Sequence, residues 1–426
     1  MHRLLRTSFV RPRGGAIAAL AMALPFAYQV REHEVQAPRN PVVSDKETVE
    51  KRWELVNGAS SLNRIKIDAP GVTFVSYEQV QDQTEDVHLG SIRVTSDSEK
   101  LVECVEVVPL PPNGVQLRFK SKECADLRGH LLTAITLARD QQVNELEARG
   151  GGVVVVEENV LVSDCEHARV DLTLEGSGSL FVNELSHDLN LKELRCAVNG
   201  SGRLQLIGGD RIRARDMLQF EAGGASSIKA FAGTFETALL KSSIAGSGAV
   251  TVVPNEKLIV HKLKTTIAGS GTATYAGQGE CSVQRCSITG SGTVDAGGIQ
   301  CQEASVTTVG SGKVTWNVAE SLKASSWGST SVQYVDSLPK LVEGKSMNLK
   351  PAPSVIQEKV APTAVPIRET AFEMSQVTPE KETTGADSDT TELGKALGFL
   401  KNAFFGDKVT YKIDIDLDDD PKSPKA

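Results

Sequence analysis

Short runs of alternating apolar and polar residues recur between residues 146 and 340, and each run follows a glycine-rich corner. The tripeptide G-S-G begins at Gly176, Gly200, Gly246, Gly269, Gly290 and Gly310, and looser copies begin at Gly150, Gly224 and Gly328. Successive first glycines are 26, 24, 24, 22, 23, 21, 20 and 18 residues apart. A unit of this length holds two or three short strands with their turns, which is the size of one rung of a β-solenoid. We therefore predict an all-β fold, a single-stranded right-handed parallel β-helix with about nine rungs over residues 146–340.

The alternation also predicts which side chains face the core. Positions four and six residues after each first glycine hold only Val, Leu, Ile, Ala, Tyr or Trp, so they should form the inner rows. The position two residues before the glycine is apolar as far as Ile288 and polar at Thr308 and Ser326, so the solenoid should taper and close near Tyr334. Glycine suits the corners because it adopts a positive φ without a Cβ clash. The predicted turn glycines are Gly176, Gly178, Gly200, Gly202, Gly246, Gly248, Gly269, Gly271, Gly290, Gly292, Gly310 and Gly312.

The first 27 residues are predicted to be a targeting segment. "MHRLLRTSFVRPRGG" carries four arginines and no acid, and the apolar run "AIAALAMALPFA" follows it. A charged start before a short apolar stretch is typical of a secretory signal peptide, whereas Arg, Ser and Thr without acids also describe a mitochondrial presequence or a short retained anchor. We expect a secreted or cell-surface protein, with mitochondrial import as the alternative. No apolar stretch has the 18 or more residues of a spanning helix.

Two segments should lead into the repeat. Residues 28–60 are predicted to be a linker and a short capping helix, since Ser44 and Glu47 form a capping box before Val49, Trp53 and Val56 at helical spacing. Residues 61–145 alternate with period two between turn signals and are predicted to be the strand-rich start of the β-helix domain.

The composition changes after residue 340. Residues 341–389 are rich in Pro, Thr, Glu and Ser and lack periodicity, so they are predicted to be a disordered linker. Residues 390–426 are predicted to hold an amphipathic helix and an acidic tail, with Leu393, Leu397, Leu400 and Phe404 on one helical face. That helix should dock onto the solenoid end or make a weak contact with a partner or membrane through 390–406.

Charge and cysteine content narrow the chemistry. The net charge of −8 argues against nucleic-acid binding. Seven cysteines without a CxxC pair and seven scattered histidines indicate no metal site and no cofactor. A bridge between Cys104 and Cys124 across a predicted hairpin stays open, whereas Cys281 and Cys301, nine residues before their glycines, should superpose as free thiols.

Outward positions three and five residues after each glycine hold the candidate functional residues. Asp295 is their only carboxylate, which cannot supply the acid–base pair of a polysaccharide-active enzyme. The remainder forms a Ser/Thr ladder, which stabilises a sheet and also offers hydroxyls to a ligand. The candidate binding residues are Thr251, Thr274, Thr315, Thr272 and Thr293. We predict a non-enzymatic binding or scaffolding protein with a glycan or protein partner; a polysaccharide lyase or hydrolase is the alternative.

The recurring G-S-G followed by alternating apolar residues resembles the family named "putative auto-transporter adhesin, head GIN domain". The resemblance covers about residues 60–340, including "LNRIKIDAPGVTFV" near its start. It implies a glycine-rich right-handed β-helix of a secreted or surface protein, an adhesin-like role and no catalytic residues. The presequence-like start and the acidic tail depart from the family.

Overall fold

The structure is a computed structural model that describes residues 29–33, 48–56, 61–79, 88–120, 124, 126–184, 186–345, 348–352 and 360–377. The chain divides into two units, residues 1–379 and 380–426. The predicted targeting segment 1–27 and the predicted helix and acidic tail 390–426 lie outside the described residues.

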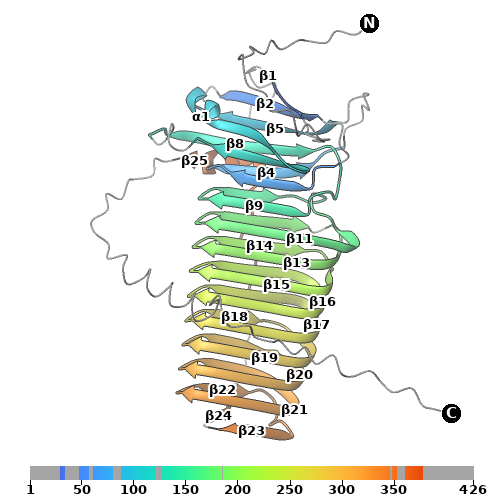
Figure 1. Cartoon of the computed structure of the whole chain (residues 1–426), viewed down its shortest axis with the longest axis vertical. Coiled ribbons are helices and arrows are strands. Elements are labelled where there is room, and N and C mark those ends of the chain that lie inside the picture. Colours follow the sequence, from blue (N-terminus) through green and yellow to red (C-terminus); the bar gives the residue numbers. More distant parts are fainter. Residues whose placement is uncertain are drawn as a thin grey trace, which may run out of the picture. The chain divides into compact units, whose positions relative to one another are not determined.

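A parallel β-solenoid forms the main body of the first unit, and its rungs stack in sequence order (Figure 1). The first glycines pair in register from each rung to the next, from Gly150 and Gly176 to Gly310 and Gly328. Each of the nine has a φ between +76° and +128°. The predicted repeat is therefore confirmed, because the same bend recurs in every layer. The second glycine of each G-S-G, from Gly178 to Gly312, does not have a positive φ.

Each rung contributes strands to two faces that meet at the glycine corner; both belong to one continuous hydrogen-bonded sheet, and the two faces are called the two sheets below. The strands that end at the first glycines are β9 (Glu145–Gly150), β11 (Asp164–Gly176), β13 (Leu189–Gly200), β15 (Arg211–Gly224), β16 (Ser227–Gly246), β17 (Ala249–Gly269), β19 (Gly279–Gly290), β20 (Thr293–Gly310) and β21 (Lys313–Gly328). Beyond the corner lie β10 (Val153–Val156), β12 (Ser179–Glu184), β14 (Arg203–Gly208), β18 (Thr272–Tyr275) and β22 (Ser331–Tyr334), and the first parts of β16, β17, β20 and β21. Strands β23 (Leu341–Lys345) and β24 (Asn348–Pro351) add a final partial rung.

The predicted inner rows form one continuous core. Every side chain four or six residues after a first glycine is buried, from Val154 to Val332, except the partly buried Tyr334. The solenoid does not close near Tyr334 as predicted, because β21 and β22 each pair with a further strand beyond that residue. In this part of the core the buried Thr308 and Thr330 hydroxyls form a hydrogen bond of 2.8 Å with each other. The core consists mainly of Val, Ile, Leu and Ala side chains, in agreement with the low aromatic content of the sequence.

An antiparallel cap covers the first rung, in place of the predicted capping helix. It comprises β1 (Gln29–His33), β2 (Val49–Val56), β5 (His88–Ser96), α1 (Glu99–Glu103), β6 (Val105–Leu110), β7 (Gly114–Phe119) and β8 (Gly129–Leu137), and the first rung itself is β3 (Arg64–Asp68) with β4 (Val72–Tyr77). The helix predicted before Val56 is wrong, because β2 pairs with β5 and buries alternate residues, Trp53 and Leu55. Burial of every second residue is the pattern of a β-strand, although the spacing of Val49 and Trp53 is also compatible with a helix.

The described residues include two disulfides, one that the sequence analysis left open and one that it did not predict. Cys104 bonds Cys124 across the cap. Cys281 bonds Cys301 between neighbouring rungs, so the predicted pair of free thiols is wrong. Register pairing places their Cα atoms 4.5 Å apart, within the range that a disulfide spans. Cys196 and Cys286 are buried free thiols.

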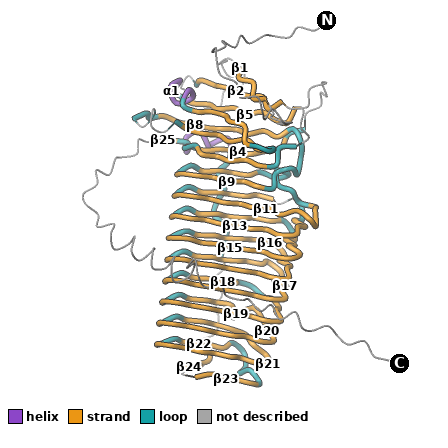
Figure 2. Tube along the Cα trace, viewed as in Figure 1, coloured by secondary structure: helices purple, strands orange, loops and turns teal. Residues whose placement is uncertain are grey.

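A segment that the sequence predicts to be disordered lies against the solenoid. Residues 360–377, called the returning segment below, include α2 (Arg368–Met374) and β25 (Gln376–Val377). Strand β25 pairs antiparallel with β8 at the cap, beside which Figure 1 labels it. Figure 2 shows that strands and loops follow one another in the same way in successive rungs of the solenoid. The linker predicted over 341–389 therefore contains strands and a helix.

Candidate binding surfaces

The predicted outward threonines align on one sheet. Thr251 pairs with Thr274, Thr274 with Asp295, and Asp295 with Thr315, so these four side chains form one file across β17, β18, β20 and β21, called the threonine row below. Thr272 and Thr293 form the parallel file two residues before it. The stacked strands thus bring together every predicted binding residue.

Exposure differs along this row. Thr251, Thr274 and Asp295 are partly exposed, and so are Thr272 and Thr293. Thr315 is only 6% exposed. Asp295 accepts a hydrogen bond from the backbone N–H of Gly297 at 3.2 Å, so its carboxylate serves a local turn. The accessible part of the row is therefore Thr251, Thr274 and Asp295.

The returning segment covers the same file nearer the cap. There the outward residues are Val155, Phe181 and Gln205, and all three are buried. Phe181 and Val155 pack in a cluster with Ala371 of α2, and Gln205 forms a pair of hydrogen bonds with the backbone of Thr363, at 2.7 and 2.8 Å. Further from the cap, Lys229, Thr251 and Thr274 of this file are partly exposed, and the described Val360 packs beside them against the cluster of Phe231, Val253 and Ala276.

A hollow of about 280 Å³ lies where the covered and open parts of the file meet. Its lining includes Phe181, Gln205 and Thr363 on the covered side, and Ser227 and Lys229 on the open side. Lys229 pairs in register with Thr251, so the hollow continues directly into the threonine row. A ligand on the row therefore has a concave, polar end beside it.

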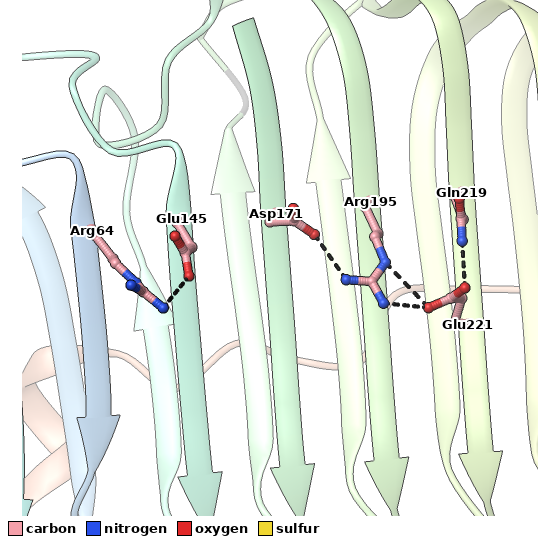
Figure 3. Close-up of polar contacts among 6 residues, drawn as sticks. All are labelled: Arg64, Glu145, Asp171, Arg195, Gln219 and Glu221. Carbon is pink, nitrogen blue, oxygen red and sulfur yellow. Dashed lines mark hydrogen bonds and ion pairs between the residues drawn. The ribbon is translucent and has the colours of Figure 1, made fainter. Parts of the chain in front are cut away.

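The other sheet carries a mainly charged file at the position five residues before each first glycine, with Gln219 and Ser305 as its uncharged members. Figure 3 shows its part near the cap, where Arg64 contacts Glu145 at 2.7 Å, and Arg195 lies between Asp171 at 3.3 Å and Glu221 at 2.6 Å. Burial lowers the pKa of Arg195, and the stronger combined effect of Glu221 and Asp171 raises it above its usual value. Acids and bases on these rungs thus neutralise one another.

The same file continues as Lys241, Lys264 and Arg285, called the basic row below. The basic row was not predicted from the sequence, because the candidate residues lie three and five positions after each first glycine, whereas the basic row lies five positions before. The signal is the base exactly five residues before Gly246, Gly269 and Gly290.

The titratable side chains of the described part of the chain bear on whether it could hold a metal ion or act as an acid. No group of three His, Cys, Asp or Glu side chains there is arranged to hold a metal ion. The most perturbed carboxylate, Glu184, is buried and accepts hydrogen bonds from the backbone N–H groups of Asn159 and Leu161, so it holds a corner together. Burial raises its pKa to about 7, with a smaller effect from Glu158. None of the helices described could span a lipid bilayer.

Comparisons with known proteins agree with the predicted resemblance. A search of curated proteins finds no match. Among solved structures, the chain is similar to a putative adhesin from Parabacteroides merdae, with 20% identity over 72% of this chain and 97% of that chain, and a TM-score of 0.35. A putative adhesin from Parabacteroides distasonis has 16% identity over 72% and 98%, with a TM-score of 0.39, and a putative lipid binding protein from the same species has 15% identity over 76% and 96%, with a TM-score of 0.33.

The family match lies on the last complete rungs. Residues 257–337 match the family described as "Putative auto-transporter adhesin, head GIN domain". These residues include the corners at Gly269, Gly290 and Gly310, which carry the repeated G-S-G. The match supports an adhesin-like or binding role. The predicted resemblance is thus confirmed: over residues 257–337 the chain is similar to the head GIN domain family of auto-transporter adhesins.

Proposed function

We propose that the protein is a secreted or surface binding scaffold without catalytic activity, and that the threonine row presents hydroxyls to a glycan or protein partner. One observation supports this face above others. The described residues 360–377 cover the outward file at the apolar Val155 and Phe181, whereas Thr251 and Thr274 are partly exposed. A file of hydroxyls that is accessible and held in register by backbone pairing suits repeated hydrogen bonding to an extended ligand.

The rigidity of the surface contributes to its suitability. Thr251 and Thr274 lie directly beside the fully buried Val250, Val252 and Ala273, so the backbone beneath the hydroxyls is fixed by the core. A surface that is already ordered loses little conformational freedom when a ligand binds. The hollow that continues from the row at Lys229 supplies a second point of contact.

The test uses an array of defined neutral oligosaccharides and the double substitution Thr251→Lys with Thr274→Lys. We expect the unmodified protein to be retained and the double variant to bind about tenfold or more weakly, because two bulky charges replace the hydroxyls. Thr307→Lys with Ser325→Lys is the matched control, since it adds the same charges to two exposed hydroxyl positions that pair in register on the other sheet. Unchanged binding by the Thr251, Thr274 variant would reject this face.

A further inference from the structure

The basic row places three like charges on neighbouring strands. Lys241 of β16 pairs with Lys264 of β17, and Lys264 pairs with Arg285 of β19. Neighbouring strands are about 4.8 Å apart, and like charges that lie directly opposite each other destabilise a sheet. Lys264 and Arg285 are exposed, and Lys241 is partly exposed.

No acid of the described chain neutralises this row. Near the cap the same file carries charges of both signs, and its ion pairs include Arg64 with Glu145 and Arg195 with Asp171. By contrast, the described residues form no ion pair or side-chain hydrogen bond with Lys241, Lys264 or Arg285. This contrast within one file marks three uncompensated charges.

Two further features add to this positive surface. Lys262 lies two residues before Lys264 on the same strand, and its pKa is lowered by burial, then by the nearby Arg285 and Lys264. Such repulsion is relieved when an anion binds between the bases. On the other side of the basic row, Ser243, Thr266 and Ser287 form a parallel file of hydroxyls.

We propose that Lys241, Lys262, Lys264 and Arg285, with the hydroxyl file beside them, bind a linear anionic polysaccharide whose carboxylate or sulfate groups follow the solenoid axis. An extended polymer with one charge per sugar can meet one base on each successive rung, and the hydroxyls can accept or donate hydrogen bonds to its ring oxygens and hydroxyl groups. The protein's net charge of −8 makes this surface selective by sign, because repulsion elsewhere disfavours a polyanion.

Polysaccharide is favoured over nucleic acid and over a membrane by what the surface lacks. Strands β16, β17 and β19 expose no Phe, Tyr or Trp side chain on which a base could stack. Their exposed large apolar side chain is Ile259, which is not part of the basic row and offers too little to insert into lipid. The surface therefore offers charge and hydroxyls in a straight file, which suits a sugar polymer.

The experiment measures binding of the full chain to fluorescent dextran sulfate and polygalacturonate at low and high salt, with neutral dextran as the uncharged probe. Two variants report on the site: Lys264→Glu with Arg285→Glu, and the milder Lys264→Gln with Arg285→Gln, which tests the same site if charge reversal impairs folding. The matched control is Arg203→Glu with Lys313→Glu, which reverses two exposed bases on the other sheet. Thermal unfolding of each variant confirms that it is folded.

We expect binding to an anionic polysaccharide, a loss of about tenfold or more in affinity in both basic-row variants, and little change in the control. High salt should weaken the binding because the bases are exposed to solvent. Equal loss in the control, or no loss in the basic-row variants, would overturn the proposal. So would tighter binding to a single-stranded DNA oligonucleotide or to phosphatidylserine vesicles than to either polysaccharide. The inference does not rest on the threonine row, whose variants carry their own test.

Discussion

Substituting alanine for Gly246 should reveal how strongly the stacked corners constrain the solenoid. Gly246 has a φ of +119°, a conformation that side chains with a Cβ rarely adopt, and this strain costs roughly 1–3 kcal/mol. A Cβ atom at this position would also lie 2.4 Å from the carbonyl oxygen of Gly224 in the rung before. That contact is with backbone, so relief requires the two rungs to separate, at a further cost of roughly 1–3 kcal/mol.

Two other glycines separate these terms. Gly150 has a φ of +83°, and a Cβ added there would meet no other atom within 4 Å, so Gly150→Ala should cost only the backbone strain, roughly 1–3 kcal/mol. Gly151 has no positive φ and would place its Cβ 3.5 Å from the Ser177 hydroxyl, so Gly151→Ala should be close to neutral or slightly stabilising.

Chemical denaturation followed by circular dichroism measures the free energy of unfolding of each variant. We expect the order of destabilisation to be Gly246→Ala, then Gly150→Ala, then Gly151→Ala, with roughly 2–6 kcal/mol for the first. If Gly246→Ala destabilises no more than Gly150→Ala, close contact between corners does not limit the stack, and the steric reasoning fails.

Three further predictions concern a buried acid, the thiols and the returning segment. Because the pKa of Glu184 is raised to about 7 in the fold from an ordinary 4.5, its contribution to stability is complete below pH 4.5 and is lost as pH rises through about 7. The stability of the native protein relative to Glu184→Gln should therefore fall by about 3 kcal/mol over this range in denaturation at several pH values. A maleimide should label exposed Cys165 in the native protein, whereas Cys286, whose pKa burial raises to about 12, should label only after unfolding; mass spectrometry of labelled peptides that shows Cys286 modified first would contradict this. Phe372→Ala should speed hydrogen exchange across residues 360–377, because Phe372 is buried and stacks on a cap histidine, whereas Arg368→Ala removes an exposed ion pair and should change stability by about 0.2–1 kcal/mol; equal exchange in both variants would show that Phe372 does not anchor the segment.

The corners and inner rows could be predicted because their constraints repeat. One glycine such as Gly246 is ambiguous, but nine at similar spacing, each followed by two apolar positions, specify both the bend and the buried face. The aligned threonines follow from the same register. Their exposure does not, since Thr315 is buried by tertiary contacts that its own strand does not reveal.

The returning segment could not be recognised from its own composition. Residues 360–377 are held by partners 158 and 211 residues away, Gln205 and Glu157, so local periodicity carries no trace of them. The indication lay on the solenoid instead. Val155 and Phe181 are apolar at outward positions, which implies that something covers them.

The contacts of the returning segment restrict how many rungs the solenoid can have between them. It packs against the cluster of Phe231, Val253 and Ala276 through Val360, and it contacts Gln205 through Thr363, Glu157 through Arg368, and β8 through β25. Duplicating or deleting one coil between these points would displace every later contact by about 4.8 Å. An ordinary solenoid gains or loses copies of its repeat at little cost, because each copy meets only its neighbours. Here the addition or loss of one rung between Glu157 and Ala276 would also break contacts of the returning segment. The number of rungs in this part of the solenoid is therefore constrained by a second part of the chain.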